Sequence, residues 1–318
     1  FSFDKFILAP EREKAAVQAA VKKVGNDNFA ATIDHASIVV LPFVNTSDDT
    51  SNEYFADGIA EEVLNLLARI EEMKVISRSS AFSYKGRNVD IPTVGRELGV
   101  AHVLEGSVRK AGSQVRIAVQ LVAAISDEQI WAESYDRQLD DIFAIQEDIA
   151  RRVVEALKLE LLTPAPTVTE TDPETYALYL KARSLRRQND KESLLQAERL
   201  LREVVDVDPD YLPALDDLIT VYTNGAYNQV WPYAEGFGLA RELTQSSLAR
   251  FPDFARFWVH MGWVQAFFDG DFAAAAASYE RALRLDDRNL RSLGDTSTFL
   301  LYMGRFEAAL KLHEFLLS

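Results

Sequence analysis

The side chains of this sequence best suited to proton transfer or metal binding are four histidines, His35, His102, His260 and His313. They are scattered along the chain without the spacing of metal ligands, and none stands close in sequence to a partner carboxylate that would suggest a catalytic pair. The chain has no cysteine, which removes disulfides, thiolate nucleophiles and sulfur-ligated metals. We therefore predict no catalytic histidine, no metal site and no cofactor.

The short acidic and glycine-containing motifs also lack the context that chemistry requires. Asp57-Gly58 could begin a phosphate or metal loop, but neither Gly-x-x-x-x-Gly-Lys-Ser/Thr nor Gly-x-Gly-x-x-Gly accompanies it, so we interpret Asp57 as a helix N-cap. The Glu61-Glu62 pair is typical of solvated charge, not of a paired acid and base. Gly106-Ser107 does not belong to a nucleophile elbow. These patterns predict a non-catalytic protein.

The composition indicates a globular chain of about two domains. At 318 residues it is about twice as long as an average domain, and its 48% hydrophobic and 26% charged residues are typical of folded proteins. The formal net charge is −15, from 49 acidic against 34 basic residues. Such a surface repels phosphate backbones, so we predict that this chain does not bind nucleic acid.

The sequence contains no membrane span of its own. No stretch of about 18 uninterrupted apolar residues occurs, and the charged segment from Phe1 to Glu13 does not resemble a signal peptide. The chain begins without Met and ends inside a helical pattern at Ser318, so we interpret it as a soluble fragment of a longer protein. We expect membrane contact only through a missing upstream helix.

The first half alternates strand-like and helix-like patterns. A continuous apolar run over 38–43 is typical of a strand buried on both faces, and the alternation within 115–122 is typical of a strand with one buried face. We further predict strands over 73–76, 101–108 and 129–135, helices over 57–70, 94–98 and 139–161, and a proline-rich boundary at 163–166. This order predicts a small α/β domain with a mixed sheet.

The second half carries a helical repeat of about 34 residues. Its clearest unit places Ala275, Tyr279 and Ala282 at small-large-small spacing, and a proline such as Pro209 ends another unit. Small residues let paired helices approach closely while an aromatic ring fills the gap. The pattern resembles the tetratricopeptide repeat (TPR) over residues 173–318, in about four units. The predicted fold class is therefore α/β plus all-α: a small mixed-sheet α/β domain followed by a TPR helical solenoid.

Four segments of the first half resemble the TolB N-terminal-like domain. They are IVVLPF at 38–43, EYFADGIAE at 53–61, VGRELGV at 94–100 and VLEGSVR at 103–109. In that family the domain often precedes TPR units in bacterial signalling proteins. The resemblance implies an upstream winged-helix DNA-binding domain, as in CadC-like regulators, or a class III adenylate cyclase domain, joined through one transmembrane helix.

The resemblance also implies a division of the chain and a location. Residues 1–35 would form a juxtamembrane helix and linker, residues 36–162 the TolB N-terminal-like domain, and residues 173–318 the TPR units. The chain would lie at the periplasmic face of the inner membrane.

A TPR solenoid binds its partners in a concave groove formed by the first helices of its units. Aligning the units places on that face Tyr176, Tyr179, Arg183, Arg186, Asp216, Thr220, Arg256 and Trp263. Aromatic and Arg side chains supply much of the energy at recognition surfaces, so we predict a protein or peptide partner in this groove. For each residue alone, ordinary packing between repeats is the alternative. A small-molecule ligand and a homodimer also stay open.

These patterns together predict the non-catalytic extracytoplasmic sensor or protein-binding region of a membrane-anchored bacterial signalling protein, of the transcriptional-regulator or adenylate-cyclase type. The alternative is a periplasmic TPR scaffold that assembles envelope proteins without signalling. An enzyme would require a catalytic set that we do not find in the sequence.

Overall fold

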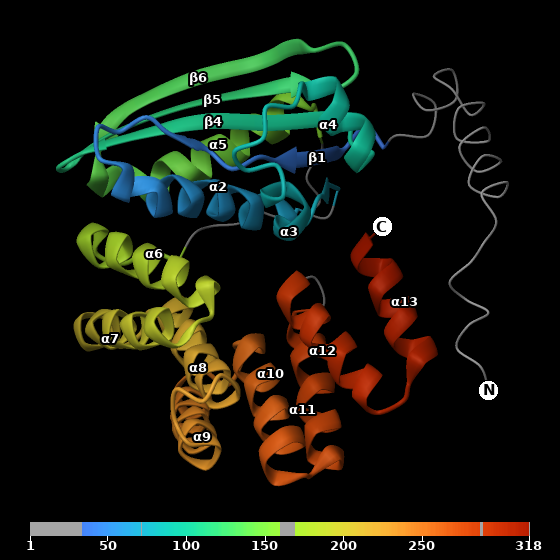
Figure 1. The fold of residues 1–318 in the computed structure, drawn as a ribbon. Coiled ribbons are helices and arrows are strands. Elements are labelled where there is room, and N and C mark those ends of the chain that lie inside the picture. Colours follow the sequence, from blue (N-terminus) through green and yellow to red (C-terminus); the bar gives the residue numbers. More distant parts are fainter. Residues whose placement is uncertain (1–33, 71, 160–168, 287–288, 318) are drawn as a thin grey trace, which may run out of the picture.

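The computed structural model describes residues 34–70, 72–159, 169–286 and 289–317 (Figure 1). A six-stranded mixed sheet with its helices is followed by a row of helices, so the predicted fold class is confirmed. Residues 1–33 of the expected juxtamembrane helix and linker (1–35) lie outside the described residues, and so does the proline-rich boundary at 163–166.

The sheet combines parallel and antiparallel pairs. Its strands are β1 (Ser37–Val40), β2 (Val44–Asn45), β3 (Lys74–Val75), β4 (His102–Ala111), β5 (Gln114–Ala123) and β6 (Glu128–Gln138). Their order is β3-β1-β4-β5-β6, and β2 also pairs with β4. β1 is parallel to β3 and β4, whereas β4, β5 and β6 form an antiparallel meander. The strands predicted over 101–108 and 115–122 are therefore present as the antiparallel pair β4 and β5, and both are longer than expected.

The two faces of the sheet are covered differently. Helices α2 (Glu53–Ala68) and α5 (Ile142–Ala156) pack on one face, where Leu104 and Ile117 are fully buried (Figure 1). Val103 points to the other face and packs with side chains of α3 (Arg78–Phe82) and α4 (Ile91–Leu98). Beyond Val103 on this second face, Glu105 and Ser107 of β4 are only half-buried. Alternation along each strand thus creates one complete core and one partly open face.

Helix ends follow local signals in the sequence. Asp90 caps α4 by accepting a hydrogen bond from the Thr93 backbone N–H at 2.8 Å, and Gly99 ends the helix in the left-handed region at φ 66°. Asp172 caps α6 (Pro173–Gln188), whose first residue is a proline that needs no hydrogen-bond partner there.

The N-cap predicted at Asp57 is wrong. Helix α2 already begins at Glu53, directly after a 3-10 turn that Asp49 caps through its side chain. Asp57 therefore lies inside the helix, where its carboxylate accepts a hydrogen bond from Lys85 Nζ at 2.5 Å.

The remaining helices follow in consecutive pairs. They are α6 with α7 (Lys191–Val207), α8 (Leu212–Tyr227) with α9 (Tyr233–Arg250), α10 (Ala255–Val264) with α11 (Phe272–Leu285), and α12 (Leu290–Tyr302) with α13 (Phe306–Leu317). Gly262 of α10 faces the Tyr279 ring of α11 so closely that a Cβ there would lie 2.8 Å from the ring. The small and aromatic residues of the repeat pattern thus bring paired helices together.

Helix α6 joins the two halves of the molecule by packing on α2 (Figure 1). Gly58 of α2 faces Leu180 of α6, and an added Cβ at Gly58 would lie 2.7 Å from the leucine side chain. Both helices contribute to one continuous apolar cluster. None of the helices in the described part of the chain has the length and hydropathy needed to cross a bilayer.

Candidate functional site between the sheet domain and the helix pairs

Charged side chains gather where α2 meets α6. Glu61 of α2 is only 4% exposed, and its carboxylate accepts hydrogen bonds from Arg78 Nε at 2.8 Å, from Arg183 Nη2 at 2.5 Å and from Arg187. Arg183 also donates to Glu62. We call these five residues the junction cluster. The expectation that Glu61-Glu62 is solvated charge is wrong, because α6 lies over this turn of α2 and supplies guanidinium partners.

The electrostatics of the junction cluster depend on mutual compensation. Burial by itself would raise the pKa of Glu61, but the guanidiniums of Arg183, Arg187 and Arg78 lower it to about 2. Burial and the neighbouring Arg183 lower the pKa of Arg187 to about 10. Glu61 and Arg187 are therefore both charged at neutral pH, and the buried Glu61 carboxylate depends on the surrounding guanidiniums to stay ionised.

A second set of charges continues from the junction cluster along the first helices of the following pairs. We call it the inner-face network; its members are Arg186 of α6, Asp216 and Asp217 of α8, Arg256 and His260 of α10, and Arg291 and Asp295 of α12. Arg186 Nε lies 3.0 Å from Asp217 Oδ1, and Arg291 reaches Asp216 at 2.7 Å and Asp217 at 3.2 Å. Consecutive first helices are therefore linked through shared carboxylates.

Asp216 is the centre of this network. It accepts hydrogen bonds from Arg256 Nε at 3.1 Å and Arg291 Nη1 at 2.7 Å, and it lies 2.5 Å from His260 Nε2. Burial opposes its ionisation, but the two guanidiniums hold the pKa of Asp216 well below its usual range. Burial lowers the pKa of His260, so this ring is neutral at physiological pH even beside a carboxylate. The pair lies inside a structural charge network.

The structure brings most of the sequence-predicted binding residues together, but in the interior. Tyr176 is fully buried, with its ring 4.7 Å from Phe143 of α5 and its hydroxyl accepting a hydrogen bond from Gln146 at 2.8 Å. Tyr179 is also buried, 5.2 Å from the ring of Tyr211. Arg183 belongs to the junction cluster, and Arg186, Asp216 and Arg256 belong to the inner-face network. These side chains hold the molecule together, and binding through them stays a prediction.

Trp263 lies apart from these charges. It is partly buried, with its ring 4.4 Å from Phe267, which in turn packs 5.0 Å from Tyr302. Tyr227 and Tyr302 are 46% and 68% exposed. Aromatic residues from three successive helix pairs therefore form a stripe whose open ring surface belongs to Tyr227 and Tyr302. Partner binding by Trp263 stays a prediction.

Sequence reasoning placed Asp216 on this face but missed the other acidic members of both charge clusters, and also Arg78, Arg187 and Arg291. A signal was present: α6 carries Arg183, Arg186 and Arg187 on adjoining positions, in a chain with a strong acidic excess. Arginines on a helix face that also carries core tyrosines require carboxylate partners. Which carboxylates they meet depends on tertiary contacts. No group of three or more His, Asp or Glu residues in the described segments is arranged to hold a metal ion.

Comparison with known proteins associates this chain with regulation. Residues 34–152 match the family described as HilA/YgeH-like transcriptional regulator, second domain. A protein of Rhizobium meliloti (strain 1021) named "Putative adenylate cyclase 3" is 40% identical over 216 residues, which cover 65% of this chain and 37% of that relative. The chain thus spans little more than a third of the relative's length. These two matches indicate a signalling-related protein.

Two solved structures are similar at lower levels. TolB from Acinetobacter baumannii is 18% identical with a TM-score of 0.30, over 39% of this chain and 29% of that chain. A thermophilic TPR protein of Thermus thermophilus is 19% identical with a TM-score of 0.40, over 56% of this chain and 82% of that chain. We base no functional argument on scores this low. The expected resemblance is therefore confirmed in part, on its regulator and cyclase side.

Proposed function

We propose that this chain is the non-catalytic, extracytoplasmic sensing and protein-binding region of a membrane-anchored bacterial signalling protein. The α/β domain and the helix pairs act as one coupled unit, and a ligand or partner on either part changes how the two pack. An upstream membrane helix transmits this change to an output domain of the transcriptional-regulator or adenylate-cyclase type.

The junction cluster is the observation that carries the proposal. Glu61 of the α/β domain is bound by Arg183 and Arg187 of the first helix pair, and Arg186 of the same helix continues into the inner-face network. A flexible tether between independent domains would not require buried, mutually compensating charges. Interactions that depend on the relative position of two domains are suited to transmit a change from one to the other.

The sequence matches support the signalling part of this proposal. The α/β domain matches the second domain of a transcriptional-regulator family, and this chain covers 37% of a relative named for adenylate cyclase. Both matches are compatible with an output domain outside the matched region. The aromatic stripe supports protein binding, because its Tyr227 and Tyr302 rings are exposed and exposed aromatic rings are typical anchors of interfaces.

A coupling experiment tests the function in the full-length protein. Arg187→Gln removes one of the three guanidiniums that bind Glu61, while those of Arg183 and Arg78 still neutralise its charge. We expect a change of about fivefold or more in output at equal protein level, measured as cellular cyclic AMP and as the transcriptome of the native host. The matched control is Arg151→Gln, a half-exposed arginine on α5 whose ion pairs remain within its own helix.

Both outcomes of this experiment are informative. Unchanged output in Arg187→Gln, with the variant folded and present at normal level, would contradict coupling through the junction. A change of equal size in Arg151→Gln would show that the output responds to any loss of charge.

Location and catalysis need separate tests. Fusions of the full-length protein to alkaline phosphatase and to green fluorescent protein at its carboxyl end should give an active phosphatase and no fluorescence if this region is periplasmic. Purified chain incubated with ATP and Mg²⁺ should form no cyclic nucleotide. Turnover that is lost on substituting a single side chain would overturn the non-catalytic assignment.

A further inference from the structure

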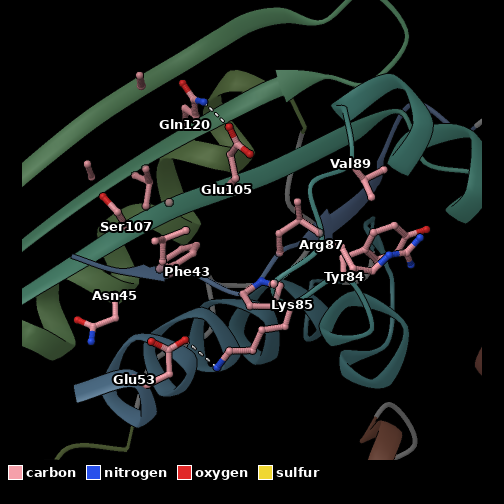
Figure 2. A pocket seen from close by; sticks show the side chains of 18 of the residues that line it. Phe43, Asn45, Glu53, Tyr84, Lys85, Arg87, Val89, Glu105, Ser107 and Gln120 are labelled. Atoms are coloured by element: carbon pink, nitrogen blue, oxygen red, sulfur yellow. Dashed lines mark hydrogen bonds and ion pairs between the residues drawn. The ribbon is translucent and has the colours of Figure 1, made fainter. Parts of the chain in front are cut away.

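A cleft of about 1000 Å³ lies on the second face of the sheet, outside both charge clusters (Figure 2). Its floor is formed by β4, β5 and β6, and its walls are the segments 41–45 and 84–89. We call it the sheet cleft. Its volume is at the upper end of the range for small-molecule sites in proteins.

The strand register explains why this part of the sheet is hollow. Ser107 pairs with Ala118 and Ala118 pairs with Ser134, while Gln120 pairs with Ala132 in the neighbouring row. These positions alternate with core residues along each strand, so their side chains point away from α2 and α5. All of them except Gln120 are small. Helix α4 covers the adjoining row at Val103 but extends no further over the floor.

One carboxylate on the floor has no cationic partner among the described residues. Glu105 is half-buried, and its side chain accepts a hydrogen bond from the Gln120 amide (Figure 2). In the described segments it makes no ion pair, unlike Glu61, which is bound by three arginines. A half-buried negative charge at the bottom of a cleft attracts a cation from solution more strongly than an exposed one does.

The cations of the cleft wall are engaged elsewhere. Lys85 lies 2.9 Å from Glu53 and 2.5 Å from Asp57, as Figure 2 shows for the first of these pairs. The Arg87 guanidinium lies over the Tyr84 ring, 4.6 Å from its centroid, and its Nη2 lies 4.0 Å from Oε2 of Glu97, which does not line the cleft. Both cations of the wall therefore have carboxylate partners, whereas the Glu105 carboxylate has no cationic partner in the described segments.

From this geometry we infer that the sheet cleft binds a small organic cation. An ammonium or guanidinium group lies beside the Glu105 carboxylate, with the Ser107 hydroxyl on the same floor, and an apolar body lies against Pro42 and Val89 of the walls. A single free carboxylate selects one positive charge. This inference names the ligand class for the proposed sensing function and rests on that function for its biological meaning.

Amide chemical-shift titration of the purified chain tests the binding. The probes are 2-phenylethylamine, which carries a ring and one ammonium group, and the neutral 2-phenylethanol of the same shape. We expect millimolar affinity for the amine, about that of a fragment of this size, and about 10-fold or weaker binding of the alcohol. The amides whose chemical shifts change when the native chain binds the amine should lie on β4 and β5. Glu105→Gln should reduce the affinity for the amine to that for the alcohol.

Two further variants control the interpretation. Glu128→Gln removes an exposed carboxylate of β6 that does not line the cleft, and it should leave both affinities unchanged. Ala118→Leu places a larger side chain on the floor of the cleft and should weaken the binding of both probes.

Three results would each overturn the inference. They are equal affinities for the two probes, no millimolar binding of the amine, and an affinity of Glu105→Gln for the amine equal to that of the native chain. The titration uses no cellular output, so failure here leaves the coupling experiment on Arg187 to decide the signalling function independently.

Discussion

The junction cluster and the sheet cleft both place glutamates at half-buried or buried positions of the α/β domain, with opposite consequences. Glu61 lies under α6 and is bound by Arg78, Arg183 and Arg187. Glu105 lies on an uncovered part of the sheet, and the hydrogen bond described for it comes from the Gln120 amide. A buried charge that is fully compensated is part of the structure, whereas an uncompensated charge in a hollow is free to select a ligand.

The comparison predicts its largest effect at Arg183, the arginine that binds both Glu61 and Glu62 of α2. Arg183→Ala leaves Glu61 and Glu62 short of a partner in a buried place, and we expect a loss of about 3–5 kcal/mol in the free energy of unfolding. The control is Arg116→Ala, because Arg116 pairs with Asp136 at the exposed end of the sheet and its loss should cost less than about 1 kcal/mol. Chemical denaturation measures both, and equal losses would contradict the distinction.

Acid should weaken the junction selectively. The pKa of Glu61 is about 2 in the folded protein and near 4.5 when unfolded, so its stabilisation is complete above about pH 4.5 and is lost as the pH falls towards 2. The shift corresponds to roughly 3 kcal/mol. Denaturation midpoints of the native chain and Glu61→Gln, measured from neutral pH downwards, should converge over that interval. A constant difference between the two proteins would show that Glu61 titrates normally.

The packed and open sides of the sheet should differ in their tolerance of added atoms. A Cβ at Gly106 would lie 2.6 Å from the Ala118 carbonyl oxygen, so Gly106→Ala should cost about 1–3 kcal/mol. Ala118→Val adds two methyl groups on the cleft side of the same strand pair and should change stability by less than about 0.5 kcal/mol. Thermal unfolding of both variants distinguishes them, and a destabilised Ala118→Val would mean that the cleft is not open.

The smallest effect is expected at Glu105 itself. Glu105→Gln keeps the side-chain shape and a hydrogen bond to Gln120, so its stability should stay within about 0.5 kcal/mol of the native chain. Glu61→Gln, the same chemical change in the junction cluster, should be clearly destabilising. Chemical denaturation measures the free energy of unfolding of both variants. Similar losses for Glu105→Gln and Glu61→Gln would contradict the contrast between the two sites.

Much of the fold was predictable because its signals are local. The cap at Asp90 was not foreseen, but the end of α4 at residue 98 was. The alternation of β5 and the helix pairs with buried Ala275 and Tyr279 were also predicted. An error arose at Asp57, which has a cap-forming side chain, because the 3-10 turn capped by Asp49 leads directly into α2 and the helix already begins at Glu53. Helix and strand periodicity depends on residues a few positions apart, which the sequence displays directly.

The sequence by itself determined the classes of element, their order and the arginine-rich face of α6. Only the tertiary structure decided which charges are structural. Arg183 and Glu61 stand 122 positions apart, and neither sequence neighbourhood shows that the other will cover it. The hollow of the sheet cleft likewise depends on the strand register, which aligns the small side chains of Ser107, Ala118 and Ser134 across three strands. Partnership between distant residues is a property of packing, and local patterns do not specify it.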